Sequence, residues 1–394
     1  MSTLNNNIVS SSKPSRVDFA DIMVAAVAGI AFAFVAVYLC VLPFSVDFAG
    51  VRDFVSYWAT GQQLVHHADP YDSDAIMRIE HAVGLKEGVL LMRNPPWALV
   101  VAYPLGFTGV RVGALLWCLC LLGCLVISVD LIRAIHGSPE NYLHWIGLSL
   151  PPAVICLIMG QSALLCLLGL ALFLRFHRTR PFVAGMSLWF CTLKPHLFVP
   201  FAVVLLVWVA CERSYRILAG CATAFGLSCA AGYLLYPSAW ARYLQMMSAP
   251  EFHAQFIPCL SQAVRLWLLP QAVWLQYLPT ALTCIWAVYH FWSRRGVWDW
   301  SQQGGIVILV SLVTAPYCYV YDQGLAVPAL LQAAYATRSR PLLAILGIAG
   351  LVIEVEMRFF TVTSAFYLWT APMWLAWYLL ANARKTEERA LAIA

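Results

Sequence analysis

The feature that most constrains this chain is a series of long apolar runs that recur between residues 22 and 381. Of the 394 residues, 62% are hydrophobic and 11% are charged, less than half of the roughly 25% usual for soluble domains. A water-soluble fold cannot bury so much apolar surface, whereas lipid tails solvate the outside of apolar helices. The runs are continuous rather than alternating, and many approach the roughly 20 residues that a membrane-spanning helix needs, which favours helices over a barrel.

We therefore predict an all-α polytopic membrane protein with about twelve transmembrane helices. The expected spans are residues 22–44, 110–132, 143–159, 162–176, 181–193, 197–211, 216–236, 270–292, 303–318, 323–337, 341–356 and 361–381. If the N-terminus lies in the cytoplasm, the cytoplasmic segments hold 15 of the 24 lysines and arginines, as the positive-inside rule expects. Both termini are then cytoplasmic.

One apolar segment does not fit the list of spans. Residues 97–107 are only about 11 residues long, and counting them as a span would move the arginine-rich loops to the outer side. We expect residues 94–107 to form a helix in the outer interface, opened by two prolines. Residues 45–109 then form a long first outer loop, which in a compact bundle is usually functional. One transmembrane domain is predicted, with a tail at each end: residues 21–382 for the domain, 1–20 for a disordered tail and 383–394 for a cytoplasmic tail.

This topology places the unusual polar residues on the outer side of the membrane. They are Asp53, Gln161, Lys194, His196, Asp322, Glu356 and Arg358. Ionisable groups at membrane depth are costly, so they are functional candidates by default. Taken singly, three of them also have structural explanations: Asp53 can pair with Arg52, Lys194 can extend to lipid head groups, and Asp322 can cap the following helix.

The other polar residues have structural explanations too. His196 can be a hydrogen-bonded packing residue, Gln161 the polar tip of a tight turn, and Arg358 one half of a surface pair with Glu356. Their convergence on one face favours a common site. The 13 cysteines lie mostly inside apolar runs and lack the spacing of a zinc or redox site, so we interpret them as small buried hydrophobic residues.

A face with both carboxylates and cations suits the transfer of a sugar from a lipid phosphate. A carboxylate can take the proton of an attacking hydroxyl, and cations can hold and stabilise the leaving phosphate. The lipid tail would lie in the bilayer, with its phosphate at Lys194 or an arginine. Because the sequence has no P-loop or dinucleotide-binding glycine motif, a soluble nucleotide donor is not supported. We expect no cofactor and no metal.

Five segments, in order along the chain, resemble glycosyltransferase family 87, a bacterial family of polytopic glycosyltransferases of the GT-C type. They are DFVSYWATGQQLVHHADPYD, NPPWALVVAYPLG, MGQSALLCLLGLALFLR, AGMSLWFCTLKPHLFVPFAVVLL and TAPYCYVYDQGLAVPAL. Three positions depart from the family pattern. Asn94 replaces the usual tyrosine, His196 replaces the commoner glutamine after Lys-Pro, and Tyr321-Asp322 stands where the family often has histidine.

The resemblance implies a GT-C-like bundle with interfacial helices in the first outer loop. It implies transfer of a hexose, often mannose, from a polyprenyl-phosphate sugar to a lipid or glycan acceptor, usually with inversion. It also implies that Asp53 is the general base, and we place Lys194 at the donor phosphate by its position. The other predicted substrate contacts are Arg52, Tyr57, Gln161, His196, Tyr321, Asp322 and Arg358.

The expected partners are the lipid-linked donor, the acceptor and membrane lipids, without nucleic acid, and the expected location is the bacterial inner membrane with the site facing the periplasm. A transporter or flippase of a lipid-linked sugar is the alternative function. That alternative favours inverted repeats around a midplane polar site, whereas this sequence has no internal repeat and gathers its polar groups at one face. A purely structural membrane protein would leave the outer acids without a role.

Overall fold

The computed structural model describes residues 52–85, 88–249, 255–337 and 339–393, with a few single positions between residues 26 and 41. For residues 384–393 it describes the backbone alone. The predicted tail at residues 1–20 lies outside the described residues, as does most of the predicted span at 22–44.

Every regular element in the described part of the chain is a helix, which confirms the predicted all-α class. The α-helices are α2 (Arg52–Val65), α3 (Ser73–Ala82), α4 (Leu99–Ala102), α5 (Val110–Ile135), α6 (His144–Ser149), α7 (Pro151–Met159), α8 (Ala163–Phe176), α9 (Pro181–Ser187), α10 (Val199–Glu212), α11 (Tyr215–Leu235), α12 (Ala239–Met247), α14 (Leu260–Leu268), α15 (Leu278–Ser293), α16 (Trp300–Thr314), α17 (Val327–Ala336), α18 (Arg340–Phe359) and α19 (Thr370–Ile393). The 3₁₀ helices are η3 (Pro96–Ala98), η4 (Tyr103–Phe107), η5 (Leu188–Leu193), η6 (Pro195–Leu197), η7 (Val273–Tyr277), η8 (Arg295–Val297), η9 (Val320–Ala326) and η10 (Ala365–Trp369).

From residue 110 onward, each run predicted as a span coincides with one helix or with two consecutive helical pieces. The predicted span 143–159 divides into α6 and α7 because Pro151 holds Leu150 in an extended conformation, with ψ 120°. Among the described residues, α5 and α11 are the two helices long and apolar enough to cross a membrane by length and composition. The number of crossings therefore stays a prediction.

Large apolar side chains point outward from several helices of the bundle. Examples are Leu227, Tyr233 and Leu234 on α11, Leu282, Ile285 and Tyr289 on α15, and Ile348, Leu351 and Val355 on α18. Such extended apolar faces are unusual on soluble monomers and fit contact with lipid or another protein. They agree with a membrane protein.

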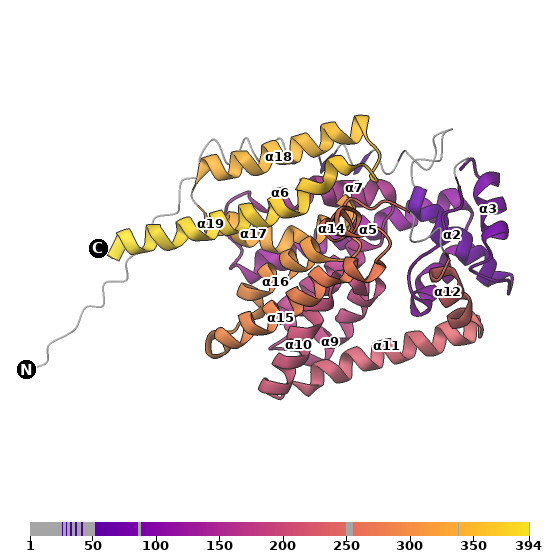
Figure 1. The fold of residues 1–394 in the computed structure, drawn as a ribbon, viewed down its shortest axis with the longest axis horizontal. Helices are drawn as coiled ribbons and strands as arrows, with labels where there is room; N and C mark the ends of the chain where they lie inside the picture. Colours follow the sequence, from indigo (N-terminus) through magenta and orange to yellow (C-terminus); the bar gives the residue numbers. More distant parts are fainter. Residues whose placement is uncertain are drawn as a thin grey trace, which may run out of the picture.

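In Figure 1 most of the long helices run roughly along the long axis of the molecule, with α2, α3 and α12 at one end and the C-terminus at the other. Two loops that were both predicted to be cytoplasmic lie side by side. The Arg178 guanidinium, after α8, is 3.0 Å from the Asp299 carboxylate, which precedes α16. This ion pair places the two loops next to each other, and the side of the membrane that they face stays a prediction.

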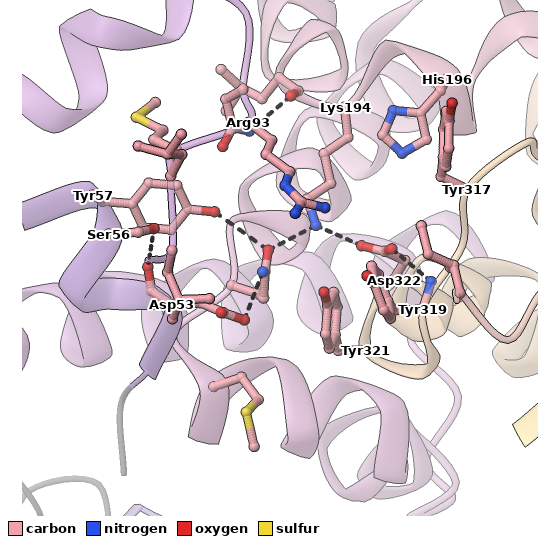
Figure 2. Close-up of a pocket in the computed structure, with 18 of the residues that line it drawn as sticks. Asp53, Ser56, Tyr57, Arg93, Lys194, His196, Tyr317, Tyr319, Tyr321 and Asp322 are labelled. Atoms are coloured by element: carbon pink, nitrogen blue, oxygen red, sulfur yellow. Dashed lines mark hydrogen bonds and ion pairs between the residues drawn. The ribbon is translucent and has the colours of Figure 1, made fainter. Parts of the chain in front are cut away.

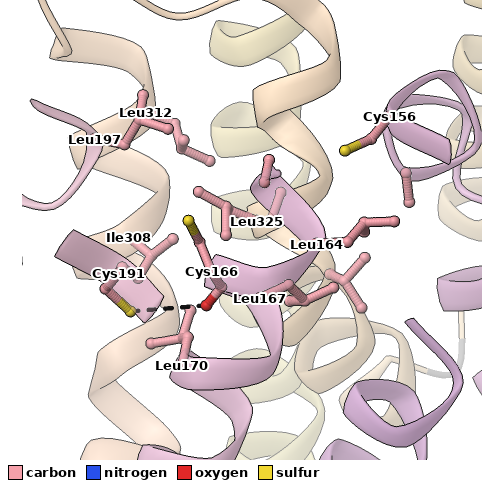
Figure 3. Packing of buried hydrophobic residues seen from close by; sticks show 14 of the residues in the cluster. Cys156, Leu164, Cys166, Leu167, Leu170, Cys191, Leu197, Ile308, Leu312 and Leu325 are labelled. Carbon is pink, nitrogen blue, oxygen red and sulfur yellow. Dashed lines mark hydrogen bonds between the residues drawn. The ribbon is translucent and has the colours of Figure 1, made fainter. Parts of the chain in front are cut away.

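The core beneath the first outer loop is built around α8, which packs against α5, α9, η5 and η9. Figure 3 shows Leu164, Leu167 and Leu170 of this helix, each of which is fully buried. Cys166 and Cys191 are buried among them as free thiols, as the sequence predicted for the cysteines of apolar runs. A helix that is apolar on every side belongs in an interior, and here other helices cover it.

The predicted interfacial segment is helical but broken into η3, α4 and η4. It packs on α2 at a glycine contact, where a Cβ on Gly61 would lie 2.4 Å from the carbonyl oxygen of Ala102, and a Cβ on Gly106 would lie 2.2 Å from the carbonyl oxygen of Gly61. Only glycine permits this approach of two backbones. Gln62 adds a hydrogen bond from its Nε2 to the carbonyl of Gly106 at 2.8 Å. The contact fixes α2, the helix whose first turn contains Asp53.

Candidate functional site

A pocket of about 360 Å³ lies where α2 and the segment that precedes η3 meet several turns of the bundle. Its volume falls within the range of about 300–1,000 Å³ typical of small-molecule sites. The polar residues that line it include Arg52, Asp53, Ser56, Tyr57, Arg93, Asn94, Gln161, Lys194, His196, Tyr317, Tyr319, Tyr321 and Asp322. The structure thus brings together residues from four separate segments that were predicted to lie on the outer side.

Four of the predicted residues form one continuous row of hydrogen bonds across the pocket (Figure 2). The amide Nε2 of Gln161 donates to Asp53 Oδ2 at 2.7 Å. The Lys194 ammonium donates to the amide oxygen of Gln161 at 2.8 Å and to Asp322 Oδ1 at 2.6 Å. Gln161 therefore separates the two carboxylates and connects Asp53 to a cation without a direct ion pair between them.

The position of Gln161 follows from the tight turn between α7 and α8. Gly160 ends α7 in the left-handed region at φ 70°, where glycine has no steric cost. The backbone N–H of Gln161 bonds to the carbonyl of Cys156 at 2.9 Å, and Trp117 donates its indole N–H to the Gly160 carbonyl at 2.7 Å. Gln161 is thus the polar tip of a tight turn, which is the structural explanation that the sequence analysis offered. Its side chain also takes part in the row of hydrogen bonds between Asp53 and Asp322.

Lys194 stands in the short break between η5 and η6. Pro195 disfavours a helical conformation for the residue before it, and Lys194 has φ −133° and ψ 66°. Asn94 holds this break by donating from Nδ2 to the carbonyl of Leu193 at 2.9 Å. The residue that departs from the family's tyrosine therefore anchors the backbone that presents Lys194.

Asp322 serves two functions in η9. Its Oδ2 accepts the backbone N–H of Tyr319 at 3.0 Å. Asp322 therefore caps η9 from inside its first turn, whereas the sequence analysis placed it at the position before the helix. Its Oδ1 pairs with Lys194, and the two side chains are only 3% and 10% exposed. The Lys194 ammonium also lies 5.1 Å from the centre of the Tyr321 ring. A buried ion pair with this many additional contacts is a fixed element of the pocket.

The protonation states follow from burial and from these partners. Burial raises the pKa of Asp53 above its ordinary value of 3.8, although the Gln161 hydrogen bond and the charge of Lys194 oppose the shift. Burial alone would lower the pKa of Lys194, but the Asp322 carboxylate outweighs it and the pKa is raised, so the ammonium stays charged. Burial lowers the pKa of His196 to about 4, so its ring is neutral at pH 7.

Aromatic side chains form another part of the pocket wall. Tyr319 and Tyr321 stack with ring centres 5.0 Å apart, and Tyr317 meets His196 edge-on at 5.8 Å. The Tyr57 hydroxyl donates to Ser162 at 3.2 Å. Sequence reasoning named Tyr57, His196 and Tyr321 but missed Tyr317 and Tyr319, although PYCYVYD spaces its tyrosines at every second position.

The arginines are distributed differently from the sequence prediction. Arg358 lies on the exposed last turn of α18 and is not among the residues that line the pocket, so we do not retain it as a ligand of this site. Its neighbour Glu356 accepts a hydrogen bond from the indole of Trp369 at 3.3 Å. Arg52 lines the pocket beside Asp53, as predicted, and Arg93 is an exposed cation of the lining that the sequence analysis missed.

In the part of the chain that the structure describes, no three His, Cys, Asp or Glu side chains lie close enough together to hold a metal ion.

The model of glycosyltransferase family 87 matches residues 93–316, which is more than half of the chain. No curated protein and no solved structure shows a significant match. The matched region contains Gln161 and Lys194, whereas Asp53 and Asp322 flank it. Because the family model covers more than half of the chain, the chain belongs to glycosyltransferase family 87 and is a glycosyltransferase.

Proposed function

We propose that this glycosyltransferase moves a hexose from a polyprenyl-phosphate sugar to a lipid or glycan acceptor, at the outer face of the bacterial inner membrane. Mannose is the hexose that the family resemblance favours. The observation that supports the proposal most strongly is the position of Asp53. Its partly buried carboxylate, hydrogen-bonded at 2.7 Å to a neutral amide, lines a pocket that two arginines also line.

Asp53 acts as the general base in a single displacement. It takes the proton of the acceptor hydroxyl as the hydroxyl oxygen bonds to the anomeric carbon, and the bond from that carbon to the phosphate oxygen breaks. The electron pair leaves with the phosphate, and attack from the opposite face inverts the anomeric centre. A second carboxylate as nucleophile is not favoured, because both oxygens of Asp322 are held by Lys194 and by the Tyr319 backbone.

Lys194 acts on the base through Gln161. An ammonium only donates hydrogen bonds, so the Gln161 oxygen must face Lys194 and its NH₂ group must face Asp53. The charge of Lys194 is already balanced by Asp322. We therefore treat Lys194 as a positioning residue rather than as the main contact of the donor phosphate.

The donor phosphate is then held by the arginines of the pocket lining, Arg93 and Arg52. A guanidinium can bind a phosphate through two parallel hydrogen bonds, which a lysine cannot do. Figure 2 shows Arg93 extending toward Lys194. The stacked rings of Tyr319 and Tyr321 offer an aromatic surface to the apolar face of the sugar.

The proposal is tested with purified protein in lipid vesicles that contain a radiolabelled polyprenyl-phosphate hexose and an octyl-hexoside acceptor. We expect one polyprenyl phosphate to be released for each sugar transferred, and no transfer from a nucleotide sugar. Arg93→Gln should raise the KM for the lipid donor about tenfold or more, since a charged contact contributes roughly 1.5–3 kcal/mol. Arg358→Gln, outside the pocket, is the matched control and should leave that KM unchanged. Transfer from the nucleotide sugar alone would contradict the proposed donor.

A further inference from the structure

A second cavity, of about 580 Å³, adjoins the Asp53 pocket. It lies between the turn that precedes α3 and the helix α12, and we call it the α3–α12 pocket. The two pockets share Leu91 and Arg93 in their linings, so they lie next to each other. The chemistry proposed for Asp53 leaves this second cavity unused.

The walls of the α3–α12 pocket are held together by polar contacts. Asp69 Oδ2 pairs with Arg242 Nε at 2.9 Å, which ties the turn to α12, and Asp69 Oδ1 accepts the backbone N–H of Tyr71 at 3.0 Å. Asp72 caps α3 by accepting the N–H of Asp74 at 3.0 Å. These contacts fix the shape of the cavity before any ligand enters.

The lining offers donors and acceptors side by side. Carboxylates come from Asp69 and Asp72, guanidinium groups from Arg93 and Arg242, an amide from Gln245 and a hydroxyl from Ser73. Sugar hydroxyls both donate and accept, so this mixture suits them. A phosphate suits it less well because the two carboxylates balance the two guanidinium groups, one of which, Arg242, is already paired with Asp69. A lipid chain would leave the polar groups without partners.

Tyr71 adds a second observation that points to a ligand. It lines the cavity, is 6% exposed, and its ring packs against Tyr243 with centres 5.9 Å apart. Within the described residues its hydroxyl is buried and has no hydrogen-bond partner. A buried hydroxyl without a partner is costly, and a ligand hydroxyl in the adjoining cavity can supply the missing bond after a small side-chain shift.

From these features we infer that the α3–α12 pocket binds a sugar unit of the acceptor, next to the unit whose hydroxyl is attacked at Asp53. The inference rests on the proposed function. The acceptor hydroxyl must reach Asp53, and the exposed Arg93 lies on the border of both pockets, so a longer glycan can extend past it from one pocket to the other. The preferred acceptor is therefore an oligosaccharide of at least two hexose units.

The test uses octyl glycosides of one, two and three mannose units as acceptor probes with the full chain in vesicles. In the wild type, kcat/KM rises from one unit to two. Gln245→Leu and Tyr71→Phe each reduce that gain roughly threefold to tenfold, the effect of one hydrogen bond, and leave the single-unit acceptor unchanged. Gln271→Leu, an exposed glutamine outside both pockets, keeps the gain. A gain that survives both variants, or no gain in the wild type, overturns the inference.

A binding measurement separates this inference from the proposed function. Saturation-transfer NMR with methyl mannotrioside needs no donor, so it reports on the α3–α12 pocket even if transfer from a polyprenyl donor fails. We expect binding that Gln245→Leu weakens, Asp53→Asn preserves and inorganic phosphate does not displace. Absence of binding, or displacement by inorganic phosphate, overturns the inference while leaving the assignment of Asp53 intact.

Discussion

Replacing Gln161 with leucine should move the acidic limb of the pH–rate profile to higher pH. Leucine nearly preserves the size of the side chain but removes the amide that donates to Asp53 at 2.7 Å. A carboxylate base is active above its pKa and loses activity as the pH falls through it. Burial already raises the pKa of Asp53, and the Gln161 hydrogen bond is the largest influence that opposes this rise. Without it the pKa must rise further.

The size of the shift follows from the strength of the bond. A hydrogen bond to a charged group contributes about 1.5–3 kcal/mol, and each pKa unit corresponds to about 1.36 kcal/mol. The limb in kcat/KM, which reports the free enzyme, should therefore move up by about 1–2 pH units. Lys194 keeps its carboxylate partner in this variant, so the positive charge near Asp53 remains in place.

The assay is transfer of labelled hexose from the polyprenyl-phosphate donor in vesicles, with kcat/KM measured across the pH range for the wild type and Gln161→Leu. Gln303→Leu is the matched control, because Gln303 contacts His290 at 3.2 Å and lines neither pocket. An acidic limb that stays in place, or moves to lower pH, in Gln161→Leu would refute the assignment of Gln161 as the group that holds Asp53 ionised.

Three further results are expected. Asp322→Asn leaves the Lys194 ammonium buried without its carboxylate and should destabilise the fold by about 3–5 kcal/mol, measured by denaturation. The double variant Lys194→Met with Asp322→Leu should regain this stability but should not regain sugar transfer. Gly61→Ala puts a Cβ 2.4 Å from a backbone carbonyl and should lower stability by about 1–3 kcal/mol, while Gly123→Ala, with open space around it, should not. His196→Gln should leave the pH–rate profile unchanged between about pH 5 and pH 8, because burial lowers the pKa of His196 to about 4. Loss of the acidic or the basic limb of that profile in the variant would contradict this expectation.

The sequence predicted the helices well because their ends are marked by local chemistry. Gly160 ends α7, Pro195 separates η5 from η6, and the apolar runs between such breaks are helices. The charge pattern then assigned the turns to two sides. Asp53, Gln161, Lys194 and Asp322 were placed on one side by that argument, and the structure brings them into one pocket.

The pairing within the site could not be predicted from the sequence. Lys194 and Asp322 are 128 positions apart, and nothing local shows that the ammonium is balanced by that carboxylate. Arg93 was missed because the direction of an exposed side chain in a loop depends on tertiary packing. Arg358 was assigned to an outer turn, but α18 continues to Phe359, so Arg358 stands on the exposed surface of a helix. The candidate residues near predicted breaks line the pocket, whereas the positions of Arg93 and Arg358 depend on packing that the sequence does not show.

The most direct test of the central claim is the activity of Asp53→Asn with the polyprenyl-phosphate hexose donor. The substitution keeps the shape of the side chain and removes the base, so kcat should fall by a factor of about 100 to 10,000. The melting temperature in vesicles and the binding of methyl mannotrioside should both stay at the wild-type values. Transfer at the wild-type rate by the folded Asp53→Asn protein would contradict the account.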